Sequence, residues 1–228
     1  MCNYFNGMPA PDKPSKHPTE VRQAGLVAAA LQQAATRSPA DITTADLAQA
    51  VGITQGAVFR HFPSKDAIWL GVMEWISDNL LAALQRATNA GEQPPPPLVA
   101  LQALFDAHVN FVVTHPGVPR VIFQELQHAH DTPLKASVRT LMQQYRTLVM
   151  GQLIRAKEQG LLAPGVDLQA AAVLLLGSVQ GLVLQSLFSG QVQAMAAQAP
   201  GVFAIYLRGI AAHPLTRADS PRELESTS

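Results

Sequence analysis

The chain has 228 residues, which is enough for one large domain or two small ones with a buried core. Hydrophobic residues make up 48% and charged residues 14%, which excludes general disorder. The formal net charge is +0, so any binding of nucleic acid must depend on a local surface. The one cysteine, Cys2, excludes an internal disulfide framework and a cysteine-based zinc site.

Residues 1–18 are rich in proline and polar residues, and we expect them to form a flexible arm. They lack the charged and then apolar pattern of a signal peptide, which favours a soluble, cytoplasmic protein. Lys13, Lys16 and His17 give this arm the charge to support contacts with a phosphate backbone.

A helix is predicted over residues 19–37, and the Ser38-Pro39 pair ends it. Thr43, followed by Asp46 three residues later, has the pattern of a capping box that starts a second helix. The predicted inner face of the first helix consists of Val21, Ala24, Ala28, Leu31 and Ala35.

A tight corner follows the second helix. Gly52 allows a sharp turn, and Thr54 can cap a short helix that continues to about His61. Val58 and Phe62 are predicted to face the core. Two short helices that cross at a glycine turn are typical of a helix-turn-helix, whose second helix enters the major groove of DNA.

The exposed side of this short helix has side chains suited to reading DNA. Gln55 can pair with adenine, Arg60 can pair with guanine or phosphate, and Ala57 can contact a thymine methyl group. Gly56 allows a close approach of the backbone, and Lys65 lies at a helix N-terminus where a phosphate can bind. Further polar candidates for DNA contact are Thr43, Thr44, Thr54 and His61.

The run TTADLAQAVGITQGAVFRHFPSKD, residues 43–66, resembles the DNA-binding domain of the TetR family of transcriptional regulators, and the likeness extends over roughly residues 20–80. The resemblance implies a homodimer of all-helical subunits that binds a pseudo-palindromic operator in double-stranded DNA. It also implies that Phe59 and His61 occupy phosphate-contacting positions. Phe59 departs from the pattern, since the family usually has tyrosine there and the phenylalanine lacks its hydroxyl.

A long helix is predicted from Lys65 to about Thr88, with an apolar stripe of Ile68, Trp69, Val72, Ile76, Leu80 and Leu84. The prolines at 94–97 form a stiff connector. Further helices are predicted over about 98–114, 120–130, 133–159, 167–189 and 200–212. The fold class is therefore all-α. The predicted parts are an arm (1–18), a three-helix DNA-binding domain (19–66, with the helix-turn-helix at about 43–62), a larger helical domain (67–212) and a disordered tail (213–228).

The larger domain is predicted to bind a small, largely apolar effector and to form the dimer. Candidate pocket residues are Phe105, His108, Phe111, Phe123, Met142 and Tyr145, although most such side chains simply fill helical cores. Residues 170–188 carry no charge and approach the length of a membrane span, but their serines and glutamines favour a helix buried against a second subunit. Candidate interface residues are Leu174, Gly177, Gly181, Leu184 and Phe188.

Other functions were weighed against this interpretation. His108, His115, His128 and His130 raise the possibility of a metal sensor, although the last two diverge if they are helical. The corner could also be purely structural in a helical module that binds a small molecule or a protein. No catalytic motif or cofactor motif is present, which argues against an enzyme and predicts no cofactor, no bound metal and no membrane partner.

Overall fold

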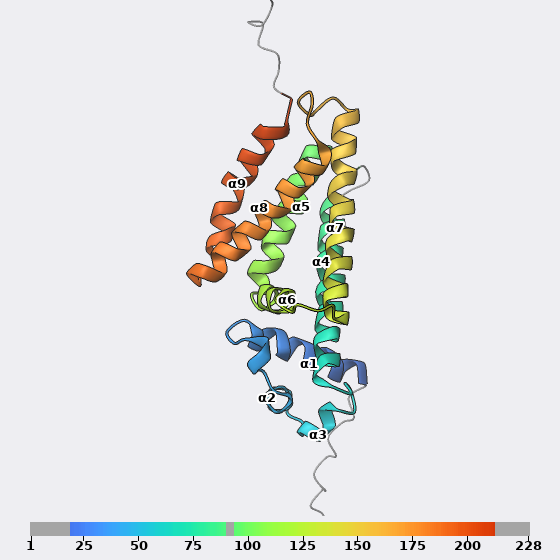
Figure 1. Ribbon diagram of the computed structural model, residues 1–228, viewed down its shortest axis with the longest axis vertical. Coiled ribbons are helices and arrows are strands. Elements are labelled where there is room, and N and C mark those ends of the chain that lie inside the picture. The colour runs from blue at the N-terminus through green and yellow to red at the C-terminus, as the bar shows by residue number, and fades with distance from the viewer. Residues whose placement is uncertain (1–18, 90–93, 213–228) are drawn as a thin grey trace, which may run out of the picture.

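The computed structural model describes residues 19–89 and 94–212, and in these ranges it contains helices and no strand (Figure 1). The all-α prediction is confirmed, while the predicted arm and tail lie outside the described residues. The helices are α1 (Thr19–Ala34), the short 3-10 helix η1 (Pro39–Asp41), α2 (Thr44–Ala50), α3 (Gln55–Val58), α4 (Lys65–Thr88), α5 (Pro97–Thr114), α6 (Val118–Leu126), α7 (Pro133–Glu158), α8 (Leu168–Ser189) and α9 (Ala194–Ile210).

The helices divide into a small head and a larger body (Figure 1). We call α1, η1, α2 and α3 the head, and α5 to α9 the body. The long helix α4 starts in the head and continues into the body beside α7, and α6 lies across the body where it meets the head. The domain boundary predicted at residue 66 falls in the first turn of α4, so the two parts share this helix.

The caps predicted in the head are confirmed. The Thr43 hydroxyl accepts the Asp46 N–H, and the Asp46 carboxylate accepts the Thr43 N–H, which completes a capping box. Thr54 caps α3 and Ser64 caps α4. Gly52 has a φ of +67°, a left-handed conformation that glycine adopts without steric strain.

Several helix details were predicted wrongly, including the end of the first helix, which is Ala34 and not residue 37, and the helix predicted over about 120–130, which is α6 (Val118–Leu126). Val21, Ala24 and Ala28 are exposed, and α1 instead buries Leu26, Val27, Ala29, Ala30, Leu31 and Ala34. Because this segment is rich in alanine, apolar residues recur at helical spacing on more than one side of the helix. The side with the larger apolar side chains is the one that is buried. The α-helical part of α3 ends at Val58, and the N–H groups of Arg60 and His61 bond to carbonyls three residues back. Helix α9 begins six residues before Pro200, which therefore lies inside the helix.

The core runs without a break from the head into the body. All six residues of the predicted α4 stripe are buried, which confirms that prediction. Helix α8 buries only one side, through residues such as Leu175, Val179 and Leu182. By length and composition alone, α4, α5 and α8 are apolar enough to cross a membrane, and in this fold each packs one side into the core.

Candidate functional site

The predicted DNA-contacting residues lie together in the head. Thr54, Gln55, Gly56 and Arg60 are exposed on α3 and on the turn after it. The exposed fraction of Phe59 is 46%, so its ring is accessible, and its contact with a sugar-phosphate edge stays a prediction. Predicted core positions nearby, Val58 and Phe62, are buried and fix the orientation of this exposed side. Among the remaining candidates, Thr43 is exposed, whereas Thr44, Ala57 and His61 are half-buried.

One hydrogen bond joins the two helices of the corner. The Gln55 side-chain amide donates to the Thr44 hydroxyl at 2.9 Å. This bond orients the Gln55 amide at the first position of α3, where a helix-turn-helix presents side chains to base edges. Gln55 thus combines exposure with a defined orientation.

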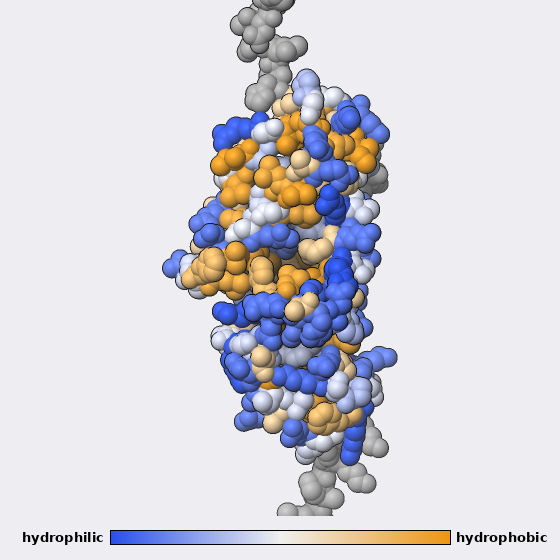
Figure 2. Space-filling model, viewed as in Figure 1, coloured by the Kyte–Doolittle hydropathy of each residue, from blue (hydrophilic) through white to orange (hydrophobic). Residues whose placement is uncertain are grey.

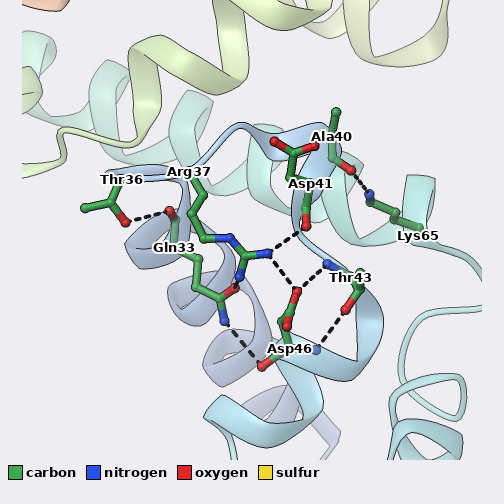
Figure 3. A network of polar contacts seen from close by, with 8 residues as sticks. All are labelled: Gln33, Thr36, Arg37, Ala40, Asp41, Thr43, Asp46 and Lys65. Atoms are coloured by element: carbon green, nitrogen blue, oxygen red, sulfur yellow. Dashed lines mark hydrogen bonds and ion pairs between the residues drawn. The ribbon is translucent and has the colours of Figure 1, made fainter.

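A polar network fixes the start of α2 on the end of α1 (Figure 3). Arg37 donates to the Asp41 carbonyl at 2.7 Å and forms an ion pair with Asp46 at 3.1 Å, while Gln33 donates to the Asp46 carbonyl at 3.3 Å. Hydrogen bonds from Thr43, together with the nearby Arg37 guanidinium, lower the pKa of Asp46. The sequence analysis did not select Arg37. Its position four residues before Asp41 and nine before Asp46 was the signal that could have indicated these contacts.

The predicted phosphate ligand Lys65 is half-buried and forms a bond within the chain. Its ammonium donates to the Ala40 carbonyl of η1 at 2.8 Å (Figure 3). No carboxylate of residues 19–89 or 94–212 lies within ion-pair distance of this ammonium. Within the described ranges, the Lys65 ammonium therefore has a carbonyl partner and no anionic partner.

His61 contributes to the packing of the head. Its carbonyl accepts the side-chain amide of Gln23 at 2.9 Å. Its Nδ1 is buried and has no hydrogen-bond partner in the described part of the chain. Only the other ring nitrogen is therefore available for the predicted contact with phosphate.

The structure has a cleft of about 540 Å³ where the head meets the body, and the sequence did not reveal it. Its walls come from η1, the start of α4, α6 and the segment that leads into α7. None of the predicted pocket residues lines this cleft. On its wall the buried Glu125 accepts the Thr132 hydroxyl, and its other oxygen lies 3.6 Å from Nε2 of His128.

The predicted effector-pocket residues are mainly parts of the core. Phe105, Phe111 and Tyr145 are buried, while Phe123 and Met142 are half-buried and pack against the core. These residues form a packed cluster and not an open cavity. The ring centroids of Phe105 and Phe203 are 5.4 Å apart, and those of His108 and Tyr145 are 5.3 Å apart.

Two polar atoms inside this cluster are noteworthy. His108 Nδ1 and the Tyr145 hydroxyl are buried, and neither has a hydrogen-bond partner among the residues described. Burial lowers the pKa of His108 to about 4 and raises the pKa of Tyr145, so both groups are neutral near pH 7. Buried polar groups without partners are rare because each one loses its hydrogen bonds to water.

We expect the protein to lose stability as the pH falls from about 6.5 to about 4. His108 has a folded-state pKa below its ordinary value, so the unfolded chain binds more protons in this range and stability rises with pH. A shift of this size corresponds to at most about 3 kcal/mol. Urea unfolding at about pH 4.5 and about pH 7 measures the difference, and His108→Leu should reduce it. The matched control is the exposed His130→Ala; if His108→Leu leaves the pH dependence unchanged, the assignment to His108 is wrong.

The predicted dimer residues lie on the outer side of α8. The exposed fractions of Leu174, Leu184 and Phe188 are 54%, 39% and 74%. A side chain added at Gly177 or Gly181 would meet no atom of this chain within 4 Å. Figure 2 shows hydrophobic residues gathered over α8 and α9. This apolar surface fits the predicted interface, which stays a prediction.

The histidines do not gather into one cluster. Residues 19–89 and 94–212 contain no group of three histidine, cysteine or acidic side chains placed to hold a metal ion. The rings of His128 and His130 lie 5.8 Å apart in the segment between α6 and α7, whereas His108 packs on Tyr145 and His115 packs on Trp75.

Comparisons with known proteins agree with this architecture. Residues 26–72 match the bacterial regulatory proteins of the tetR family, and residues 97–200 match the tetracyclin repressor-like C-terminal domain. The nucleoid occlusion factor SlmA of Vibrio cholerae is 28% identical over 142 residues, which cover 61% of this chain and 70% of that protein. The match to SlmA of Alteromonas mediterranea, at 27% identity, covers 51% of this chain and only 58% of that factor.

Solved structures show the same fold. The transcriptional regulator FadR of Bacillus subtilis, solved in complex with stearoyl-CoA, has a TM-score of 0.69 at 16% identity, covering 82% of this chain and 98% of that one. With the capped helix-turn-helix, the helical body and the two family matches in agreement, this chain is a DNA-binding regulator that belongs to the tetR family of bacterial regulatory proteins.

Proposed function

We propose that the protein binds a pseudo-palindromic operator as a homodimer and releases it when a small molecule binds the helical body. The observation that carries the proposal is the exposed edge formed by Gln55 and Gly56 of α3 and by Arg60 in the turn after it, while Val58 on the other side of α3 is buried. In a dimer, two such edges would meet half-sites about 34 Å apart or a small multiple of this distance.

Phosphate contacts would come from residues around this edge. Thr43 and Thr44 lie at the start of α2, and Lys65 lies at the start of α4. The Thr43 hydroxyl accepts one internal bond, so its proton remains available to a phosphate oxygen. Base contacts would then give specificity, and these groups would fix the register on the duplex.

Selection of genomic fragments with the purified full-length protein tests this function. We expect a short pseudo-palindromic sequence to be enriched above bulk DNA at physiological salt. Enrichment without any shared sequence would contradict operator recognition, because contacts to phosphate alone do not depend on sequence.

The effector would bind among the residues that surround His108 and Tyr145 in the body. Their two neutral polar atoms without partners could each bond to an uncharged effector, while Phe105 and Met142 would contact its apolar part. Their helices, α5 and α7, both pack on α4, which continues into the head. An effector that moved these helices apart would therefore change the spacing of the two α3 helices in a dimer.

We expect Gly181→Leu to convert the dimer into a monomer. A Cβ atom at this position meets no atom of its own chain within 4 Å, and residue 181 is exposed, so the fold should tolerate the substitution. It would prevent the close approach of a partner helix along the outer side of α8. Sedimentation velocity measures the result, and Gly151→Leu on α7, which also meets no neighbouring atom, is the matched control. A Gly181→Leu variant that stays dimeric would place the interface elsewhere.

A further inference from the structure

The cleft between head and body has the size of a small-molecule site. Its volume of about 540 Å³ lies inside the range of about 300–1,000 Å³ that such sites occupy. It is separate from the cluster around His108 and Tyr145, since neither residue lines it. Its walls are formed by η1, the first turns of α4, α6 and the start of α7.

One part of the cleft is apolar. Trp69 and Leu70 of α4 line it together with Val121 of α6 and Leu134 of α7. Trp69 lies one helical turn after Lys65, so the indole and the lysine share one face of α4. This arrangement suits a ligand with an apolar body whose charged end lies beside Lys65.

Lys65 is the group that can attract an anion to this end of the cleft. Lys65 is the one cation on the wall that is charged at all ordinary pH values, and its present partner is a neutral carbonyl. Glu125 also lies on the wall, where it accepts the Thr132 hydroxyl and has its other oxygen 3.6 Å from Nε2 of His128. Asp66 is exposed and lies in the first turn of α4, where the helix dipole stabilises its carboxylate.

We propose that this cleft is a second small-molecule site, and that it binds an amphiphilic organic anion whose acidic group pairs with Lys65. The anion would replace the Ala40 carbonyl as the partner of the ammonium, and the apolar body would lie against Trp69. A charge-assisted bond of this kind is stronger than the bond to a neutral carbonyl.

The site would act on DNA binding directly, and this consequence rests on the proposed role of Lys65 as a phosphate ligand. One ammonium cannot pair fully with both the ligand and the DNA backbone. Gln124 lines the cleft and accepts the Ser38 hydroxyl at 3.1 Å and the Ala40 N–H at 3.2 Å. The bound ligand would therefore also lie beside hydrogen bonds that join the head to the body.

Two dyes with related ring systems test the proposal on the full-length protein. Anilinonaphthalene sulfonate is an amphiphilic anion, and phenylnaphthylamine lacks its sulfonate. Trp69 and Trp75 are the two tryptophans of the chain, so a Trp75→Phe background makes Trp69 the sole tryptophan reporter. Quenching of Trp69 fluorescence measures the affinity for each dye in the Trp75→Phe parent and in the same parent with Lys65→Met or Lys135→Met added. Lys135 is the matched control because it does not line the cleft and instead donates to the His128 carbonyl.

We expect Lys65→Met to weaken the binding of the sulfonate dye about tenfold and to leave the binding of the neutral dye unchanged. Lys135→Met should bind both dyes as its parent does. The proposal is overturned if Lys65→Met binds the sulfonate dye as tightly as its parent, if both dyes weaken equally, or if neither dye quenches Trp69. Electrophoretic shifts on the same variants separate the two roles of Lys65. A Lys65→Met protein that loses the dye but keeps full affinity for DNA would contradict the phosphate contact and leave the anion site standing.

Discussion

The double substitution Arg60→Ala and Lys65→Ala is expected to weaken specific operator binding at physiological salt by at least about 100-fold. Arg60 is exposed directly after α3, and Lys65 lies at the start of α4 with no anionic partner among the residues described. A dimer would lose four contacts, and each contact of this type contributes about 1–3 kcal/mol. Fluorescence anisotropy with a labelled operator fragment measures the loss.

The control for this experiment removes the same charge elsewhere. Arg86 lies in the last turn of α4 and Lys157 in the last turn of α7, both far along the body from the head. We expect Arg86→Ala with Lys157→Ala to bind DNA like the wild type, with a similar slope of affinity against salt. The double variant in the head should show a smaller slope because it releases fewer counterions. Specific binding that survives both substitutions in the head would refute the proposed interface.

The affinity for the phosphate backbone also depends on position 59, where phenylalanine has no hydroxyl to donate. Its ring is nearly half exposed beside Arg60. Phe59→Tyr should therefore strengthen binding to DNA with little effect on the core, because Phe59 is exposed and is not one of the buried residues. The departure noted in the sequence thus concerns one contact and leaves the corner intact.

Features of the head that depend on neighbours in the chain could be predicted from the sequence. The capping box of Thr43 and Asp46, the caps at Thr54 and Ser64 and the turn at Gly52 each involve residues a few positions apart, so local rules locate them. The partner of Lys65 could not be found in this way. Ala40 lies 25 residues earlier in the chain, and only the packing of η1 against α4 brings the two together.

In the body, too, contacts between residues far apart in the sequence could not be predicted. The cleft forms where residues of η1, α4 and α6 meet, and no local pattern marks their junction. Sequence reasoning correctly selected His108 and Tyr145 as polar tips in an apolar setting, but it could not show that the surrounding helices pack tightly around them. The exposed side of α8, in contrast, was indicated by the sequence, because Leu174, Leu184 and Phe188, which were selected for an interface, lie outside the core.

Gly117→Ala is expected to destabilise the protein by about 3 kcal/mol, the upper end of the usual cost of overpacking. Gly117 precedes α6, and a Cβ atom at this position would lie 2.1 Å from the Leu31 carbonyl oxygen and 3.1 Å from the Ala35 nitrogen. Both are backbone atoms of the segment at the end of α1, so no side-chain rotation can relieve the clash. The residue has an ordinary φ of −75°, which means that lack of space, and not backbone conformation, requires glycine here.

The same substitution tests whether the head and body are held together at this point, because α1 belongs to the head and α6 to the body. Urea unfolding of Gly117→Ala gives the loss in free energy of unfolding, and Gly151→Ala in α7 is the matched control. A methyl group at Gly151 meets no atom within 4 Å, so this control should gain about 0.5–1 kcal/mol. If Gly117→Ala is as stable as the wild type, α6 must stand farther from α1 than described. If it is destabilised, the backbones of α1 and of the start of α6 are in close contact, and we expect a movement of α6 at this point to displace the end of α1 in the head.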